Sequence, residues 1–472
     1  MSPDLRGDLA AAVGEKHVVA ASDIAERYRV DVLGKYTSTP GWLVKPGSTG
    51  EVSQVVKIAA RRGLPVTVVG GQTGTCGGAI AQEGGIALSL ERMNRIEEID
   101  TVSMTLTVEA GCILQAAQEA VEEQGAFLPL DLGSRGSATV GGCIAANAGG
   151  NRVLRWGMMR EMVTGLEVVL ADGTIVSSLT KMIKDNAGFA WKHLMIGSEG
   201  TLGIVTKAVL RLRPNPVTNQ TALVALSSFE NVARLLRDLE VRLSGQLSSF
   251  ELMWGDFYEA MTEAQLAFRP RPMETGHAFY VLIEKLGGDP EADSEQFERA
   301  LMAEIEEGVV EDAVLAKSER EREALWMVRE DMQPGLKAFH PFMVYDVSMA
   351  LADMPRFVVD ARRNVEAAFP GARMIFYGHA GDGNLHIIIN VGDEGRARER
   401  QVDEQVYRAV QAVGGSIAAE HGVGMSRIPF LGMTRSPEEL ELMHKLKQAL
   451  DPAGTLNPGK VLTDSSPASI HA

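Results

Sequence analysis

Residues 130–157 read LDLGSRGSATVGGCIAANAGGNRVLRWG, and this stretch decides how the first half of the chain is interpreted. It is rich in glycine and poor in large apolar side chains, and it offers small polar groups on Ser134, Ser137, Thr139 and Asn147. A core strand would not have this composition. Dense glycine instead marks a backbone that turns sharply or approaches a ligand closely. The stretch therefore predicts a wall of a ligand site.

Two further glycine clusters flank it in the sequence. Residues 69–78 read VGGQTGTCGG and follow a predicted strand at residues 64–69, and residues 196–206 read IGSEGTLGIVT. Around Gln72 and Thr73, a run of unobstructed backbone N–H groups could face a pyrophosphate. The spacing is not GxGxxG and no long helical pattern opens behind it, which argues against a Rossmann site. Three such clusters in one domain predict a large ligand.

Hydrophobic periodicity places these clusters in an α+β framework. Thr49 is expected to cap a helix that ends at Gly63, and Asp172-Gly173 to join two strands in a hairpin. After residues 213–221, RPNPVTNQT, strands at ALVAL, FELMW, YVLIE, VYDVSMA and RMIFY alternate with amphipathic helices. A chain of 472 residues is longer than a single core usually serves. We therefore predict two α+β domains with a boundary near Pro214 and Pro216.

Composition excludes several classes of protein. The formal net charge is -16, which argues against nucleic-acid binding and against electrostatic attachment to an anionic membrane. No apolar run reaches the roughly 18 residues of a membrane span, and the N-terminus lacks a secretion signal. The three cysteines, Cys76, Cys112 and Cys143, form no CxxC pair, which favours a reducing compartment. A cytoplasmic protein is expected.

Histidines and carboxylates gather in two short segments of the second half. RMIFY, the turn-rich AGDGN and LHIII are together typical of a hairpin, which would bring His379 and His386 side by side across its end. Two imidazoles so placed can share a metal ion, and Glu420 could supply an oxygen ligand. The segments therefore predict a metal site.

With these motifs in view, the chain resembles the FAD-linked oxidoreductases of the vanillyl-alcohol oxidase and p-cresol methylhydroxylase (PCMH) superfamily. The resemblance runs from about Trp42 to Leu462 and is closest to the branch of D-lactate dehydrogenase, the glycolate oxidase flavin subunit and D-2-hydroxyglutarate dehydrogenase. Its motifs, in order, are PGSTGEVSQVV, VVGGQTGTCGG, GGCIAANAGGNR, IGSEGTLGIVT, GHAGDGNLH, AAEHGVG and LDPAGTLNPGK.

The resemblance implies an α+β flavoprotein of two domains. It gives an N-terminal helical segment at residues 1–37, a PCMH-type FAD-binding domain at 38–216, a substrate and metal (cap) domain at 217–450, and a C-terminal segment at 451–472 that returns to the FAD domain. FAD is expected to bind noncovalently, because the first loop carries Gln72 through Cys76 where covalent relatives often have histidine. The cofactor-binding residues so implied are Gly70, Gly71, Gln72, Thr73, Gly74, Gly77, Gly78, Ser137, Thr139, Gly141, Gly142, Ala146, Gly149, Gly203, Ile204, Val205 and Asn457.

The branch also implies a chemistry for the histidine segments. GHxGDGNLH followed by EH binds a divalent metal there, usually zinc, which carries ligand roles to His379, His386 and Glu420. By the same resemblance His421 is the catalytic base and Asn384 a substrate contact. Oxidation of a 2-hydroxy acid needs a hydride acceptor such as flavin N5, and chelation by a metal lowers the pKa of the hydroxyl that the base deprotonates.

Three further positions, compared with the same branch, predict the class of substrate. Arg329 aligns with an arginine that holds the substrate carboxylate. Gln333 and Val344 align with the threonine and the lysine that help hold D-2-hydroxyglutarate in that branch. Gln333 is expected to contact the substrate. Because the lysine is missing, a D-lactate-like, longer aliphatic or aromatic (R)-2-hydroxy acid is expected, with D-2-hydroxyglutarate as the open alternative.

Other functions remain open at this level. An oxidase that uses dioxygen and a dehydrogenase that passes electrons to an electron-transfer flavoprotein, cytochrome or quinone are not distinguished. A metal-dependent hydrolase that binds a nucleotide and a noncatalytic FAD-binding subunit are further alternatives. The expected partners are the hydroxy acid and the electron acceptor, without nucleic acid or a membrane span, and a homodimer is left open.

Overall fold

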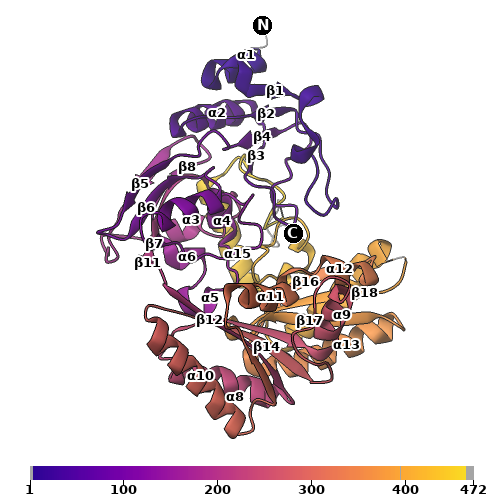
Figure 1. The fold of residues 1–472 in the computed structure, drawn as a ribbon. Helices are drawn as coiled ribbons and strands as arrows, with labels where there is room; N and C mark the ends of the chain where they lie inside the picture. Colours follow the sequence, from indigo (N-terminus) through magenta and orange to yellow (C-terminus); the bar gives the residue numbers. More distant parts are fainter. Residues whose placement is uncertain (1–3, 394, 464–472) are drawn as a thin grey trace. The chain divides into compact units, whose positions relative to one another are not determined.

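The computed structural model describes residues 4–393 and 395–463, which divide into two compact units (Figure 1). Unit 1 comprises Met1–Gly149, Gly157–Asn215 and Glu420–Ala472. Unit 2 comprises Gly150–Trp156 and Pro216–Ala419. Each unit has its own sheets and helices, so both are α+β, as the sequence predicts.

Unit 1 carries two main sheets. A four-stranded sheet has the order β1-β2-β4-β3, in which β2, β4 and β3 run parallel. An antiparallel five-stranded sheet has the order β5-β6-β10-β8-β9. The strands are β1 (Val18–Ala20), β2 (Trp42–Val44), β3 (Val66–Val69), β4 (Ile86–Ser89), β5 (Ile96–Asp100), β6 (Thr105–Glu109), β7 (Ala126–Phe127), β8 (Val163–Val169), β9 (Ile175–Ser178), β10 (Ile204–Arg211) and β11 (Arg213–Pro214).

The helices of unit 1 confirm the main sequence signals. They are α1 (Leu5–Val13), α2 (Thr49–Arg62), α3 (Leu114–Glu122), α4 (Val140–Ala146), α6 (Met159–Met162), α7 (Lys192–Met195) and α15 (Pro437–Leu450). The predicted cap of α2 is wrong by one residue, because the Ser48 hydroxyl accepts the Glu51 N–H (3.2 Å) and Thr49 is already helical. Gly63 ends the helix in the left-handed region, at φ 61°, as expected. The Asp172-Gly173 hairpin between β8 and β9 is also confirmed.

Unit 2 is built on one antiparallel seven-stranded sheet of order β15-β12-β14-β13-β17-β18-β16. Its strands are β12 (Thr218–Leu226), β13 (Leu247–Trp254), β14 (Phe279–Gly287), β15 (Asp312–Leu315), β16 (Met343–Ser348), β17 (Arg373–His379) and β18 (Asn384–Asn390). Its helices are α5 (Val153–Trp156), α8 (Phe229–Arg242), α9 (Gly255–Gln265), α10 (Pro290–Glu306), α11 (Glu319–Glu330), α12 (Gln333–Leu336), α13 (Met354–Ala368) and α14 (Glu399–Ala412).

Helices cover both faces of this sheet. On one face, α8 and α10 bury Leu235, Leu239 and Phe297 against β12, β13 and β14 (Figure 1). On the other face, α9 and α11 bury Tyr258 and Trp326 against the same strands and against β17 and β18. Burial on both faces explains why the strands are apolar almost throughout. A charged residue inside such a strand therefore needs a partner.

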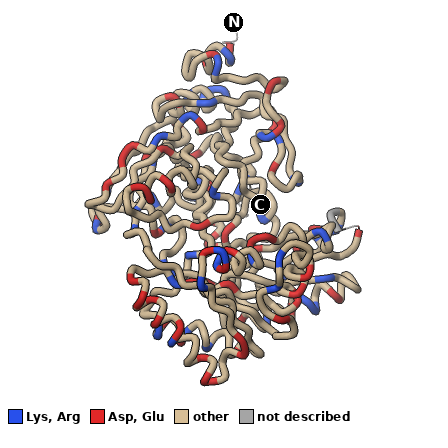
Figure 2. Tube along the Cα trace, viewed as in Figure 1, with Lys and Arg blue, Asp and Glu red and all other residues tan. Residues whose placement is uncertain are grey.

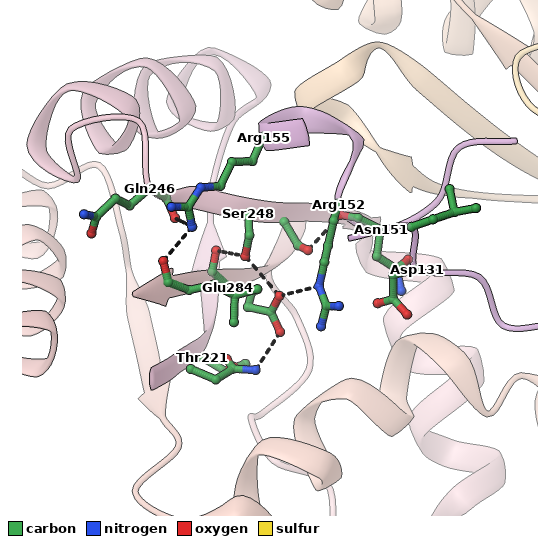
Figure 3. A network of polar contacts seen from close by, with 12 residues as sticks. Asp131, Asn151, Arg152, Arg155, Thr221, Gln246, Ser248 and Glu284 are labelled. Carbon is green, nitrogen blue, oxygen red and sulfur yellow. Dashed lines mark hydrogen bonds and ion pairs between the residues drawn. The ribbon is translucent and has the colours of Figure 1, made fainter. Parts of the chain in front are cut away.

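The short helix α5 and the residues before it are fastened to this sheet by a polar network (Figure 3). Arg152 Nε lies 3.2 Å from Glu284 Oε1 on β14, and the same carboxylate accepts the Ser248 hydroxyl at 3.0 Å. Arg155 donates to the carbonyl of Leu286 (2.6 Å). The end of the second glycine cluster, Gly150–Trp156, is thus an integral part of unit 2.

The charges are distributed without a strongly basic region. Lys and Arg are interspersed with Asp and Glu in both units (Figure 2), and acidic residues outnumber basic ones by 62 to 46. Among the described residues, no helix is long and apolar enough to cross a membrane. The three cysteines are free and buried.

Candidate functional site

The first glycine loop of unit 1 exposes backbone donors. It follows β3, and within the described residues the N–H groups of residues 71–78 donate no hydrogen bond to another protein group. A side chain on Gly74 would meet nothing within 4 Å, and the buried Gln72 Nε2 has no partner in the described part of the chain. A row of unused donors with room in front of it fits the pyrophosphate of a dinucleotide.

Other glycines in these clusters hold protein segments together. A Cβ added to Gly71 would lie 2.1 Å from the Ser137 carbonyl oxygen, and one on Gly141 would lie 2.6 Å from the Ala110 Cβ. Thr139 caps α4 by accepting the Gly142 N–H at 3.2 Å. Close approach of the first and second clusters is therefore one physical reason for their glycine content, in addition to any contact with a cofactor.

The third cluster contributes a buried carboxylate, Glu199, whose partners the sequence analysis did not predict. Glu199 accepts the N–H groups of Val423 (2.7 Å) and Gly424 (2.9 Å), in the loop that starts at His421. Burial raises the pKa of the Glu199 carboxyl, and the two N–H donors oppose this rise. Asn457 Nδ2 donates to the carbonyls of Gly78 (3.0 Å) and Glu199 (2.7 Å). Within unit 1, Glu199 and Asn457 join the first loop, the third cluster and the His421 loop.

The remaining cofactor positions lie around these three segments. Ile204 and Val205 begin β10 and are buried, and Gly203 lies directly before them, where a Cβ would be 2.9 Å from the Met195 sulfur. Ala146 is the last residue of α4 and Gly149 the last residue before the chain enters unit 2. Gly70 packs against Thr139. Sequence positions predicted to bind FAD thus all belong to unit 1.

In unit 2 the predicted histidine hairpin is confirmed. Strands β17 and β18 pair antiparallel, with Tyr377 opposite His386. His379 and His386 are both 6% exposed, and their ring centroids lie 5.3 Å apart. Asn384, at the start of β18, is 4% exposed, and neither side-chain amide atom has a hydrogen-bond partner among the described residues. An unsatisfied buried amide is costly, which indicates a polar ligand in front of it.

The donor set around this hairpin fits a metal ion. Three side chains each offer one ligand atom, and these atoms all lie within 4.8 Å of one another: His379, His386 and Glu420. Glu420 directly follows Ala419, the last residue of unit 2. Tetrahedral ligands at about 2.1 Å from a zinc ion are about 3.4 Å apart, a separation that is compatible with this upper limit of 4.8 Å. Two nitrogens and one oxygen are the ligand set of many catalytic zinc sites, which keep a position for substrate.

Carboxylates lie behind both imidazoles. Glu251 on β13 is directly opposite His379 on β17, and its Oε1 lies 2.7 Å from His379 Nδ1. Asp346 on β16 is opposite His386 on β18, with Oδ1 3.9 Å from Nδ1. Neither acid was predicted. The signal was a single carboxylate inside an otherwise apolar strand, as in FELMW and VYDVS.

The predicted substrate residues lie on elements next to the hairpin. Arg329, in the last turn of α11, is 7% exposed, its Nε lies 3.1 Å from Glu251 Oε2, and its guanidinium carbon lies 4.5 Å from the centre of the Tyr377 ring. Gln333 is the first residue of α12. Val344, on β16, is 41% exposed.

Comparison with known proteins gives the family. A family profile described as the C-terminal domain of FAD linked oxidases matches residues 215–461, and a profile described as an FAD binding domain matches residues 40–178. The chain belongs to the FAD-linked oxidases. Its expected superfamily, its two-domain α+β fold and its use of FAD are thereby confirmed.

Relatives place it in the branch of the D-2-hydroxy-acid dehydrogenases, which are oxidoreductases that act on a CH–OH group. A D-2-hydroxyglutarate dehydrogenase of Xanthomonas citri pv. viticola is 38% identical over 454 residues, 95% of this chain and 94% of the relative. A protein of Schizosaccharomyces pombe provisionally named as a mitochondrial D-lactate dehydrogenase is 36% identical, over 92% of this chain and 84% of the relative. The hydrolase and the noncatalytic subunit are no longer alternatives.

Solved structures agree on the fold. A p-cresol methylhydroxylase with substrate bound superposes with a TM-score of 0.77 at 17% identity, over 97% of this chain and 96% of that chain. An alkyldihydroxyacetonephosphate synthase gives a TM-score of 0.73 at 18% identity, over 98% and 86% of the two chains. At these identities the likeness concerns the fold alone.

Proposed function

We propose that this enzyme oxidises a small (R)-2-hydroxy monocarboxylate to the 2-oxo acid, with FAD and a divalent metal bound. The observation that carries the proposal is the donor set of His379, His386 and Glu420 beside the unsatisfied amide of Asn384. A 2-hydroxy acid presents two adjacent oxygens, the hydroxyl and one carboxylate oxygen, which suit a metal with open positions.

The residues divide the reaction between them. FAD, when bound, supplies the acceptor for the hydride that leaves the substrate Cα. The metal, when bound, supplies the positive charge that makes the substrate hydroxyl more acidic. His421 takes the hydroxyl proton as the general base. Asn384 donates to or accepts from the substrate oxygens, and Arg329 provides the cation for its carboxylate.

The choice of a monocarboxylate depends on strand β16. It reads MVYDVS and carries no lysine or arginine, and Val344 stands where the resemblance places the lysine of D-2-hydroxyglutarate dehydrogenases. A second substrate carboxylate would meet an aliphatic side chain there, so desolvation would not be offset by a charge. D-2-Hydroxyglutarate is the second candidate, favoured by the names of most relatives.

We also propose an electron acceptor and a cellular location for the enzyme. An electron-transfer flavoprotein, a cytochrome or a quinone would reoxidise the flavin, and dioxygen would do so in an oxidase. Free buried cysteines are consistent with a reducing compartment, and we propose the cytoplasm.

The test is an anaerobic visible spectrum of the purified protein with a panel of (R)- and (S)-2-hydroxy acids, before and after metal is removed by a chelator. We expect the flavin bands to bleach with one (R)-monocarboxylate, to stop bleaching after chelation, and to bleach again when zinc is added back. Bleaching that persists in the fully stripped protein would refute the metal-dependent reaction. Fastest bleaching with D-2-hydroxyglutarate would refute the monocarboxylate.

A further inference from the structure

Glu251 makes two polar contacts that point to a role in this site. It lies in the middle of β13, at 0% exposure, with apolar neighbours on both sides of it in the sequence. One carboxylate oxygen contacts His379 and the other contacts Arg329. A charge so deeply buried is retained only with well-placed partners. Both partners here are residues to which the proposed function assigns a ligand or a substrate contact.

The two contacts of His379 agree on where its proton lies. At 2.7 Å from Glu251 Oε1, Nδ1 carries the hydrogen and donates it. On the opposite side of the ring, Nε2 lies 3.5 Å from Arg329 Nη2, a cationic N–H group that has no lone pair to offer. Nε2 therefore carries no hydrogen, and its lone pair faces this N–H group in the structure. This is the tautomer that a metal ion requires from a histidine ligand.

Glu251 also fixes the orientation of Arg329. It engages Nε (3.1 Å), while the guanidinium plane is held over the Tyr377 ring at 4.5 Å. Glu251 engages Nε and Nη2 faces His379 Nε2 at 3.5 Å, so among the described residues Nη1 is the guanidinium nitrogen that is left for another acceptor such as a carboxylate.

We propose that Glu251 is a positioning residue, which holds the His379 imidazole ready for a metal ion and Arg329 ready for the substrate carboxylate. The inference rests on the proposed function, since it assumes that His379 binds a metal. One carboxylate thereby sets the relative placement of the two groups that meet the same substrate. The cross-strand register of Glu251 and His379 makes this placement a property of the sheet.

Unit 2 contains a matched control. Glu284 on β14 is 1% exposed, faces Arg152 and also accepts from a serine and an asparagine (Figure 3). Among the described residues, its carboxylate makes no hydrogen bond or ion pair with a histidine. Glu284→Gln therefore removes a buried strand carboxylate from an arginine without touching the donor set. Glu251→Gln and Glu251→Asp are the test variants, since the aspartate keeps the charge opposite Arg329 while drawing it away from His379.

The experiment is a calorimetric titration of the metal-stripped, FAD-loaded proteins with zinc chloride, with flavin absorbance and circular dichroism as checks of folding. Loss of such an outer carboxylate weakens metal binding by about 10- to 100-fold, and we expect this in both Glu251 variants and not in Glu284→Gln. We also expect the KM for the hydroxy acid to rise in Glu251→Gln.

The outcomes separate the inference from the function on which it rests. Folded Glu251 variants that bind zinc as tightly as the wild type would overturn the inference and leave Glu251 as a counter-ion of Arg329. A wild-type protein that binds no zinc, and no other divalent metal, would overturn the metal-dependent function itself. If Glu251→Gln does not fold, the aspartate variant gives the same decision.

Discussion

Introduction of a lysine at position 344 should shift the proposed preference for a monocarboxylate toward a dicarboxylate. Val344 and Asp346 are two residues apart on β16, so their side chains leave the same face of the strand, about 6.8 Å from each other along it. Asp346 is directly opposite His386, so the side chains of Val344, Asp346 and His386 lie on the same face of the sheet. Because Val344 is 41% exposed, a lysine there keeps its ammonium hydrated and should not disturb the core.

The size of the effect follows from the exposure of the site. Two unit charges 4 Å apart attract by about 4 kcal/mol at an effective dielectric constant of 20, and by about 1 kcal/mol in water. Partial exposure favours the lower part of this range, at about 1.4 kcal/mol, which is about tenfold. We expect Val344→Lys to raise kcat/KM for D-2-hydroxyglutarate relative to D-lactate by about that factor.

The assay is the anaerobic reduction of an artificial acceptor dye with each hydroxy acid as substrate. Val344→Met supplies length without charge, and Val359→Lys adds the same charge at an exposed position of α13. The ratio should change in Val344→Lys alone. An unchanged ratio in Val344→Lys, or an equal change in Val344→Met, would refute the assignment of this position to the distal end of the substrate.

Three further predictions concern unit stability and reactivity. Because the pKa of Glu199 is raised in the folded state, the folded chain binds the proton of this carboxyl more tightly than the unfolded chain, and unit 1 should lose stability as the pH rises above 4.5. Urea unfolding of Glu199→Gln should lack this loss of stability. The same dependence of stability on pH in wild type and variant would contradict the prediction. Burial raises the pKa of the Cys143 thiol to about 12, so iodoacetamide at pH 8 should leave Cys143 unmodified by mass spectrometry until the chain unfolds. Arg152→Met leaves Glu284 without its cation and should destabilise unit 2 by about 3 kcal/mol in urea, whereas the double variant with Glu284→Met should recover most of that loss.

The fold class and the histidine hairpin were accessible from the sequence because both depend on local patterns. Alternation of apolar residues marked the strands of unit 2, and the turn-rich AGDGN between two apolar runs fixed which strands form the hairpin. Once β17 and β18 pair, His379 and His386 must lie near one end. Local signals also account for the one-residue error at α2, since Ser48 and Thr49 are both good capping residues.

The residues that sequence reasoning missed act over long separations. Glu251 precedes His379 by 128 residues, and Glu199 precedes Val423 by 224. No local pattern predicts which strand will lie beside β17 or which loop will lie beside the third glycine cluster. The glycine clusters illustrate the same limit, because the close packing of Gly71 on Ser137 depends on two segments that are far apart in the sequence. A single carboxylate in an apolar strand indicates that a polar or charged group contacts it in the fold, but it does not indicate which residue supplies that group.

Burial of a carboxylate does not by itself distinguish a functional acid from a structural one, since Glu251 and Glu284 are almost equally buried and both face an arginine. Their partners differ. The carboxylate of Glu284 is contacted by Arg152, which directly precedes α5, by Asn219 on β12 and by Ser248 on β13. Glu251, by contrast, contacts His379, whose ligand atom lies within 4.8 Å of those of His386 and Glu420, and Arg329, which also faces His379. The identity of these partners, rather than the buried charge, distinguishes the proposed role of Glu251 from the structural role of Glu284.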